Sequence, residues 1–222
     1  MKVGTRLVLL AAGLLISQLA SAAGVPTPTE AGIEHRPTRA DFAGESASAA
    51  AREVADWVVA SNDHGGLPFV IIDKVEAKAL AFDRRGVLLG AAPALFGLAR
   101  GDDSPPGIGD RKLATITPAE RITPAGRFIA SLGRNVAGQD ILWVDYDAAV
   151  SLHRVIAGKP AERRLERLAT ASPLDNRISY GCINVPVDFY ERVVRPLFDA
   201  TTGIVYILPE TRPVRDVFAL AP

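Results

Sequence analysis

The 222-residue sequence contains one cysteine, Cys182, in the stretch RISYGCINVP that runs from Arg177 to Pro186. An ionised thiol is a nucleophile, and nearby positive charge or a helix N-terminus favours its ionisation. A helical pattern begins near Pro186, so the spacing predicts a thiol at a strand-to-helix turn. Gly181 allows close backbone approach and leaves amides free to face a developing oxyanion. The alternative is a small buried thiol that packs as an apolar side chain.

A cysteine nucleophile needs a base that takes its proton. His153 is the best candidate of three histidines, because it lies late in the strand-like run AVSLHRV, residues 149–155. The nucleophile and its base have to meet only in space, so their separation in the sequence is no obstacle. A histidine in such a strand is also often structural. His64 lies in a glycine-rich turn and is expected to face solvent, and His35 lies in a predicted linker.

The N-terminus predicts export from the cytoplasm. Lys2 and Arg6 accompany an apolar run over residues 7–16, and small residues follow at 20–23. This order is typical of a secretory signal peptide, and the run is too short to span a bilayer stably. We therefore expect residues 1–22 to be cleaved and the mature protein to be periplasmic, without stable membrane insertion. An uncleaved anchor is the alternative.

Composition excludes several other classes of function. The 25 basic and 25 acidic residues balance, so no overall field favours nucleic acid or membrane binding. Three histidines and one cysteine are too few for a structural zinc site, and we expect no metal. The single cysteine has no partner for an intramolecular disulfide, which is notable in an exported chain.

Short apolar runs separated by charged or glycine-containing turns predict one mainly β domain with a few helices. The strand-like runs are residues 67–73, 78–83, 86–90, 141–147, 149–155 and 203–209, and the helical patterns are residues 45–60, 161–169 and 187–198. Residues 23–44 are expected to be a linker or N-terminal arm, residues 45–210 the catalytic domain with its core at 67–209, and residues 211–222 a tail. The stretch 100–127 has little periodicity, and a loop of that length is usually functional or disordered.

The residues around the cysteine resemble the active-site signature of the L,D-transpeptidases, the YkuD-type enzymes of peptidoglycan. The matching positions are Ser179, Gly181, Cys182, Ile183 and Asn184, with a histidine upstream. The segment PFVIIDKVEAKALAFDRRGVLLG resembles the opening hairpins of that domain, and ITPAGRF (122–128) resembles its Thr-Pro-x-Gly-x-Phe segment. The resemblance spans about residues 67–209. It implies an L,D-transpeptidase-like β-sandwich or barrel catalytic domain.

Carried over by position, the resemblance implies that Cys182 is the acylated nucleophile and His153 its base or imidazolium partner. The backbone carbonyl of Arg154 would orient the histidine, and Ser179 and Asn184 would support the turn. The implied reaction is attack on the L-centre carbonyl of meso-diaminopimelate in a peptidoglycan stem, with release of D-alanine. An amine or water would then resolve the thioester. No cofactor is implied, and carbapenem-type β-lactams would be inhibitors because they mimic the acyl donor.

The implied oxyanion hole consists of the backbone amides of Tyr180, Gly181 and Cys182. Tyr180 stands where the family has a histidine, so the work of that imidazole does not carry over. A phenol donates a hydrogen bond but stays neutral near pH 7, with a pKa of about 10. The ring either contributes to the site or only packs.

Three points stay open in the sequence. The helical pattern at 161–169 lengthens the interval between His153 and Cys182, and is either a lid or a solvated surface helix. Arg177 is expected to meet substrate carboxylates, with a lone surface arginine as the alternative. A cysteine hydrolase of the same fold, or a catalytically silent wall-binding module, would fit the same residues.

Overall fold

The computed structural model describes residues 38–220. The predicted signal peptide at 1–22, the first part of the predicted arm and His35 lie outside the described residues. Within the described range, no helix is long and apolar enough to cross a membrane.

The described residues form a mainly β domain with a few helices, as predicted. The order of strands in the main sheet is β3 (Leu88–Pro93), β2 (Lys78–Phe82), β1 (Phe69–Asp73), β10 (Gly203–Ile207), β5 (Gly126–Arg134), β6 (Asp140–Asp145), β7 (Val150–Arg154) and β9 (Ile183–Val185). Neighbours are antiparallel except β1–β10 and β7–β9, which are parallel. A second, parallel pair joins β4 (Phe96–Gly97) to β8 (Arg177–Ser179).

The two ends of this strand order meet at Leu95 and Asn184. Leu95, just after β3, donates a backbone hydrogen bond of 2.8 Å to Asn184 of β9 and accepts one of 2.9 Å from it. The sheet is therefore nearly closed into a barrel, in agreement with the predicted sandwich or barrel. The closure also ties the strand that follows the cysteine to the opposite end of the sheet.

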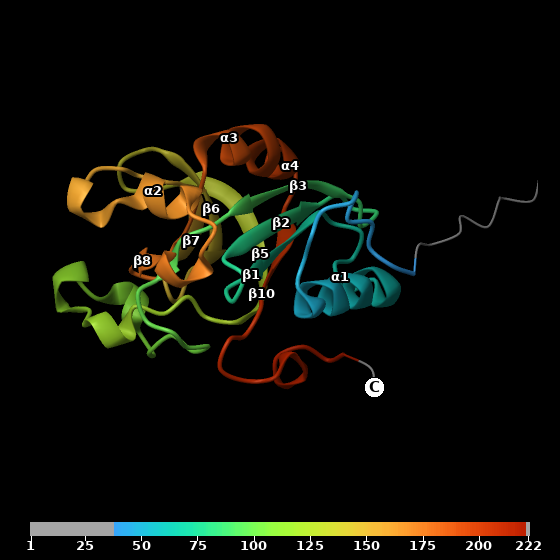
Figure 1. Ribbon diagram of the computed structural model, residues 1–222, viewed down its shortest axis with the longest axis horizontal. Coiled ribbons are helices and arrows are strands. Elements are labelled where there is room, and N and C mark those ends of the chain that lie inside the picture. The colour runs from blue at the N-terminus through green and yellow to red at the C-terminus, as the bar shows by residue number, and fades with distance from the viewer. Residues whose placement is uncertain (1–37, 221–222) are drawn as a thin grey trace, which may run out of the picture. The chain divides into compact units, whose positions relative to one another are not determined.

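Strands β1 and β10 are buried on both faces, which explains their almost continuous apolar sequences. Because side chains alternate along a strand, Phe69 and Ile71 pack toward the helix α1 (Ala49–Ser61). Val70 and Ile72 belong instead to the barrel interior, together with side chains of the C-terminal helical segment. Figure 1 shows α1 and that segment, which includes α3 and α4, on different sides of β2 and β3.

The predicted helices are present with shifted boundaries. Helix α1 begins after Ser48, whose hydroxyl accepts the Ala51 N–H, and ends at Asn62, whose φ of 57° is left-handed. The later helical elements are α2 (Arg164–Ala169), α3 (Val187–Phe189), a π-helical stretch (Tyr190–Val194) and α4 (Arg195–Phe198). The π-helical stretch ends two residues before Pro196, which has no backbone N–H for a regular helical hydrogen bond.

Two expectations need correction. Strand β5 occupies residues that were not predicted as a strand, and it begins within the last two residues of the irregular stretch 100–127. His64 does not face solvent: its side chain is buried, and its ring nitrogens lie 3.2 Å from the Val58 carbonyl and 3.0 Å from the Arg84 carbonyl. It is a structural histidine that joins the end of α1 to the β2–β3 turn.

Candidate active site

Cys182 lies in the turn between β8 and β9 and is half-buried. Its sulfur is 3.6 Å from the hydroxyl of Ser151 and 3.7 Å from the carbonyl oxygen of Ala149. The predicted strand-to-helix turn is wrong, because strand β9 separates the cysteine from the helical segment that begins at Val187. The groups that act on the thiol therefore come from the neighbouring strand β7.

The parallel pairing of β7 and β9 brings the histidine to the cysteine. His153 is level with Asn184, and Leu152 with Ile183, so Cys182 lies next to the start of β7. Side chains two residues apart in a strand share a face, which places Ser151 and His153 on the same side. Both side chains lower the pKa of the Cys182 thiol. Ser151 was missed in the sequence, although its place two residues before His153 is a usable signal.

A backbone carbonyl fixes the orientation of the imidazole. His153 Nδ1 lies 2.7 Å from the carbonyl oxygen of Arg154, which can only accept a hydrogen bond. Nδ1 therefore carries a proton, and Nε2 is left for the thiol. The Arg154 carbonyl therefore lies where a group that orients the imidazole would have to lie.

The cysteine is more acidic than an ordinary thiol. Burial raises the pKa of the Cys182 thiol, but the hydrogen bond and charge of His153 lower it, and Ser151 adds to the lowering. The net direction is downward, toward the thiolate that reacts. An apolar pocket around a lone thiol would shift the pKa in the opposite direction.

The side chain of Arg154 fixes the end of β7. Its guanidinium pairs with Asp140 at 3.1 Å and also with Glu191, and it lies 4.2 Å from the ring centroid of Tyr190. These contacts join β6, β7 and the C-terminal helical segment. The carbonyl that orients His153 therefore belongs to a residue held on three sides.

Hydrogen bonds within the turn define the backbone around the thiol. Ser179 donates to the carbonyl of Cys182 at 2.6 Å and accepts the N–H of Gly181 at 3.1 Å. The side-chain amide of Asn184 also donates to the Cys182 carbonyl, at 3.2 Å. Since the Gly181 amide is already engaged, two of the three predicted oxyanion donors remain. In residues 38–220, no acceptor takes the N–H of Tyr180 or Cys182.

Position 181 requires glycine, both because of its backbone conformation and because a side chain has no room there. Its φ is 138°, in a region that side chains rarely adopt, and an added Cβ would lie 2.8 Å from the carbonyl oxygen of Ile122. The carbonyl of Gly181 accepts a 2.7 Å hydrogen bond from the hydroxyl of the fully buried Thr123. The sequence did not assign this role to Thr123, although it is the first residue of the TPxG match.

Arg177 does not reach the cysteine. Its guanidinium pairs with Glu210, with one hydrogen bond of 3.0 Å, and donates to the carbonyl of Lys74 at 3.1 Å. Glu210 belongs to a buried ionic cluster in which Lys74 pairs with Asp102 at 2.9 Å. The predicted contact of Arg177 with substrate therefore finds no support in this position.

The predicted helix at 161–169 touches the site. Leu168 of α2 is buried against Leu95, while Leu165 is exposed. From the start of the helix, Arg164 donates a 2.7 Å hydrogen bond to the side-chain oxygen of Asn184. The helix packs against Leu95 and Val155 and supports the strand that follows the cysteine.

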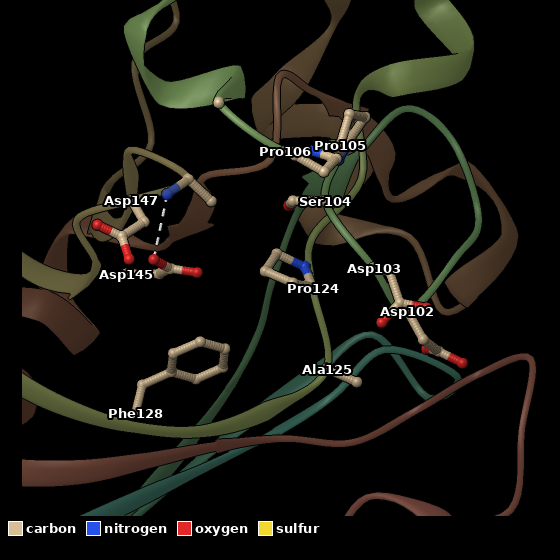
Figure 2. Close-up of a pocket in the computed structure, with 12 residues that line it drawn as sticks. Asp102, Asp103, Ser104, Pro105, Pro106, Pro124, Ala125, Phe128, Asp145 and Asp147 are labelled. Carbon is tan, nitrogen blue, oxygen red and sulfur yellow. Dashed lines mark hydrogen bonds between the residues drawn. The ribbon is translucent and has the colours of Figure 1, made fainter.

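A pocket of about 270 Å³ lies beside the cysteine turn. Pro124 and Ala148 line it, and the residues next to them, Thr123 and Ala149, contact the turn directly. Its other lining residues are Asp102, Asp103, Ser104, Pro105, Pro106, Gly107, Ala125, Phe128, Asp145 and Asp147. Figure 2 shows Asp145 and Asp147 on one side, Asp102 and Asp103 on the other, and Pro124 between them.

Comparison with known proteins gives similarities in structure alone. No family model and no curated protein matches the chain. The helical cell shape determining protein Pgp2 from Campylobacter jejuni is similar at 12% identity and a TM-score of 0.45, over 66% of this chain and 49% of that chain. The LD transpeptidase LdtMt1 in complex with imipenem is similar at 16% identity and a TM-score of 0.38, over 64% and 58%. The L,D-transpeptidase from Xylanimonas cellulosilytica is similar at 14% identity and a TM-score of 0.35, over 64% and 60%.

The chain thus spans about half of the length of the Campylobacter protein and about three fifths of the other two. The similar structures include L,D-transpeptidases, the family that the motifs resemble. With TM-scores under 0.5, these similarities carry no conclusion about what this chain does. The site itself is a cysteine–histidine pair at the edge of a nearly closed β sheet.

Proposed function

We propose that this protein is a cysteine acyltransferase that acts on the peptide stems of peptidoglycan outside the cytoplasm. The observation that carries the proposal is the arrangement of His153, whose Nδ1 is 2.7 Å from the Arg154 carbonyl, on the strand that pairs with β9 directly after Cys182. This arrangement suits proton transfer from a thiol, the first need of a cysteine nucleophile. The SYGCIN motif supplies the substrate class through its resemblance to the L,D-transpeptidases.

The reaction begins when the thiol of Cys182 gives its proton to Nε2 of His153 and becomes a thiolate. The sulfur attacks the carbonyl carbon at the L-centre of diaminopimelate, and the amides of Tyr180 and Cys182 donate to the oxyanion. One such donor contributes about 3 kcal/mol in known cases. The carbon–nitrogen bond then breaks, the imidazolium gives its proton to the leaving amine, and D-alanine departs. A thioester remains on the cysteine.

The second half resolves the thioester. An amine, or water, gives its proton to His153 and attacks the same carbonyl carbon. The carbon–sulfur bond breaks and the thiol is restored. The reaction therefore needs no metal ion and no redox partner. The pocket beside Thr123 and Ala149 provides space next to the turn for part of a peptide.

The test is mass spectrometry of purified protein incubated with a tetrapeptide stem that ends in D-alanine. We expect a thioester adduct on the wild type, free D-alanine, and neither with Cys182→Ala. Adding an amine acceptor should give a transferred product, whereas hydrolysis alone would assign the enzyme to the hydrolases. Absence of both adduct and D-alanine from a folded protein would refute the proposed activity.

A further inference from the structure

Arg121 differs from the other arginines around the cysteine turn. Arg154, Arg164 and Arg177 each form an ion pair with a carboxylate, whereas no carboxylate within residues 38–220 lies within 4 Å of the Arg121 side-chain nitrogens. The adjacent Glu120 is held elsewhere, by Arg111 at 2.6 Å and by Thr117. An arginine side chain that packs on a protein without a carboxylate partner has donors to offer to a ligand.

The guanidinium of Arg121 is held against the residue before Gly181. Its central carbon lies 3.9 Å from the ring centroid of Tyr180. One terminal nitrogen donates to the Ile116 carbonyl at 3.3 Å, and the buried Nε atom has no protein acceptor. Packing over an aromatic ring holds a guanidinium in place. Of the Arg121 nitrogens, Nη1 has no acceptor within residues 38–220 and is left to donate to a carboxylate.

The backbone places this group beside the scissile position. Residues 121–123 run along the cysteine turn, since the Ile122 carbonyl faces the Cα of Gly181 and Thr123 bonds the Gly181 carbonyl. Tyr180, whose ring contacts the Arg121 guanidinium, belongs to the turn that carries the proposed oxyanion donors. A substrate whose carbonyl lies at Cys182 would extend its leaving group past this residue.

We propose that Arg121, held by stacking on Tyr180, binds the terminal carboxylate of the acyl donor, the group that leaves with D-alanine. The inference rests on the proposed function and names the part of the substrate that this arginine selects. It also gives Tyr180 a role as the platform for Arg121. Arg121 then makes the contact with a substrate carboxylate that the sequence suggested for Arg177.

The test compares two tetrapeptide donors that differ only at the C-terminus, one with a free carboxylate and one with a primary amide. We expect the wild type to acylate Cys182 about 10- to 100-fold faster with the carboxylate donor, chiefly through a lower KM. Arg121→Gln should lose that preference and keep its rate with the amide donor. Alkylation of Cys182 by iodoacetamide should stay at the wild-type rate, because the thiol and His153 are untouched.

The controls separate charge, packing and activity. Arg85→Gln removes a positive charge in the β2–β3 turn and should leave both rates unchanged. Arg121→Lys keeps the charge without the fork, should retain only part of the preference, and serves if Arg121→Gln does not fold. A wild type without preference, or an Arg121→Gln variant that slows with both donors equally, would overturn the inference while the proposed function stands. A wild type that iodoacetamide labels but neither donor acylates would overturn the proposed function itself.

Discussion

The hydroxyl of Thr123 donates a 2.7 Å hydrogen bond to the carbonyl of Gly181, 58 residues further along the chain. The same hydroxyl accepts the N–H of Gly97 at 2.9 Å, and the carbonyl of Thr123 accepts from the buried Lys74 ammonium at 2.9 Å. Thr123 thus joins the cysteine turn and β4 through its hydroxyl, and an ionic cluster through its backbone carbonyl. The position of the proposed oxyanion donors depends on this junction.

Thr123→Val should therefore reduce both stability and activity. The substitution keeps the shape but leaves the Gly181 carbonyl and the Gly97 N–H without a partner in a fully buried place. Each unsatisfied buried group costs about 1–3 kcal/mol, which urea unfolding would measure. Acylation should slow further than alkylation by iodoacetamide, because only acylation uses the oxyanion donors.

Thr123→Ser is the matched variant, since it restores the hydroxyl and removes only a methyl group. Its acylation rate should lie close to the wild type, while Thr201→Val, which changes an exposed hydroxyl, should have no effect. If Ser and Val at position 123 behaved alike, the hydrogen bond to Gly181 would not be what positions the turn.

The pH dependence of thiol reactivity follows from the lowered pKa of Cys182. Thiolate forms as pH rises through that pKa, so alkylation by iodoacetamide should reach half of its plateau below the ordinary thiol value of about 8.5. His153→Gln removes the larger lowering influence and leaves the effect of burial. The midpoint should then move upward, and acylation at pH 7 should fall.

His64→Gln provides the comparison for the histidine prediction. This residue bonds the Val58 and Arg84 carbonyls, so its replacement should lower the free energy of unfolding without moving the alkylation midpoint. An unchanged midpoint in His153→Gln would show that the imidazole does not act on the thiol.

Much of the fold was predictable because β1 and β10 are apolar on both faces and α1 has a clear cap and periodicity. Strand β5 was not, although Phe128 and Leu132 contact the barrel interior at alternate positions around the buried Ala130. Ile129 points outward with 68% of its surface exposed, which breaks the alternation of apolar and polar residues, and the strand itself contains two glycines, Gly126 and Gly133. Strand β9 is too short for any periodic signal, so the helix after it seemed adjacent to the cysteine.

The proposed reactive pair could be named from the sequence, whereas its supporting residues could not. Cys182 and His153 stand out by rarity and residue type. The roles of Ser151 and Thr123 depend on pairings between distant segments, and a serine or threonine in a single sequence carries no such information. The same holds for Arg177 and Arg121, because which arginine is engaged by a carboxylate is decided by the fold.

A carbapenem should acylate the cysteine if the site accepts strained acyl donors. We expect incubation with imipenem to add one equivalent of mass to the wild type, through opening of the lactam by Cys182. Cys182→Ala should show no adduct and nearly the same melting temperature, since the thiol is half-buried in a turn. A large loss of stability in Cys182→Ala would favour the buried, structural thiol, and an adduct on that variant would place the reaction elsewhere.

Tyr180 is the site residue that departs from the family pattern, and two variants test what it contributes. Its amide is a proposed oxyanion donor, and its ring supports the guanidinium of Arg121 at 3.9 Å. Tyr180→Phe keeps both the amide and the ring, so acylation should slow less than tenfold, or 1.4 kcal/mol. Tyr180→Ala keeps the amide but removes the ring, and should weaken the preference for a donor with a free carboxylate while alkylation of Cys182 is unchanged. Rates of acylation by the two donors and of alkylation give both answers in one experiment. A Phe variant slowed a hundredfold at unchanged stability would mean that the phenol itself donates to the oxyanion or orients His153.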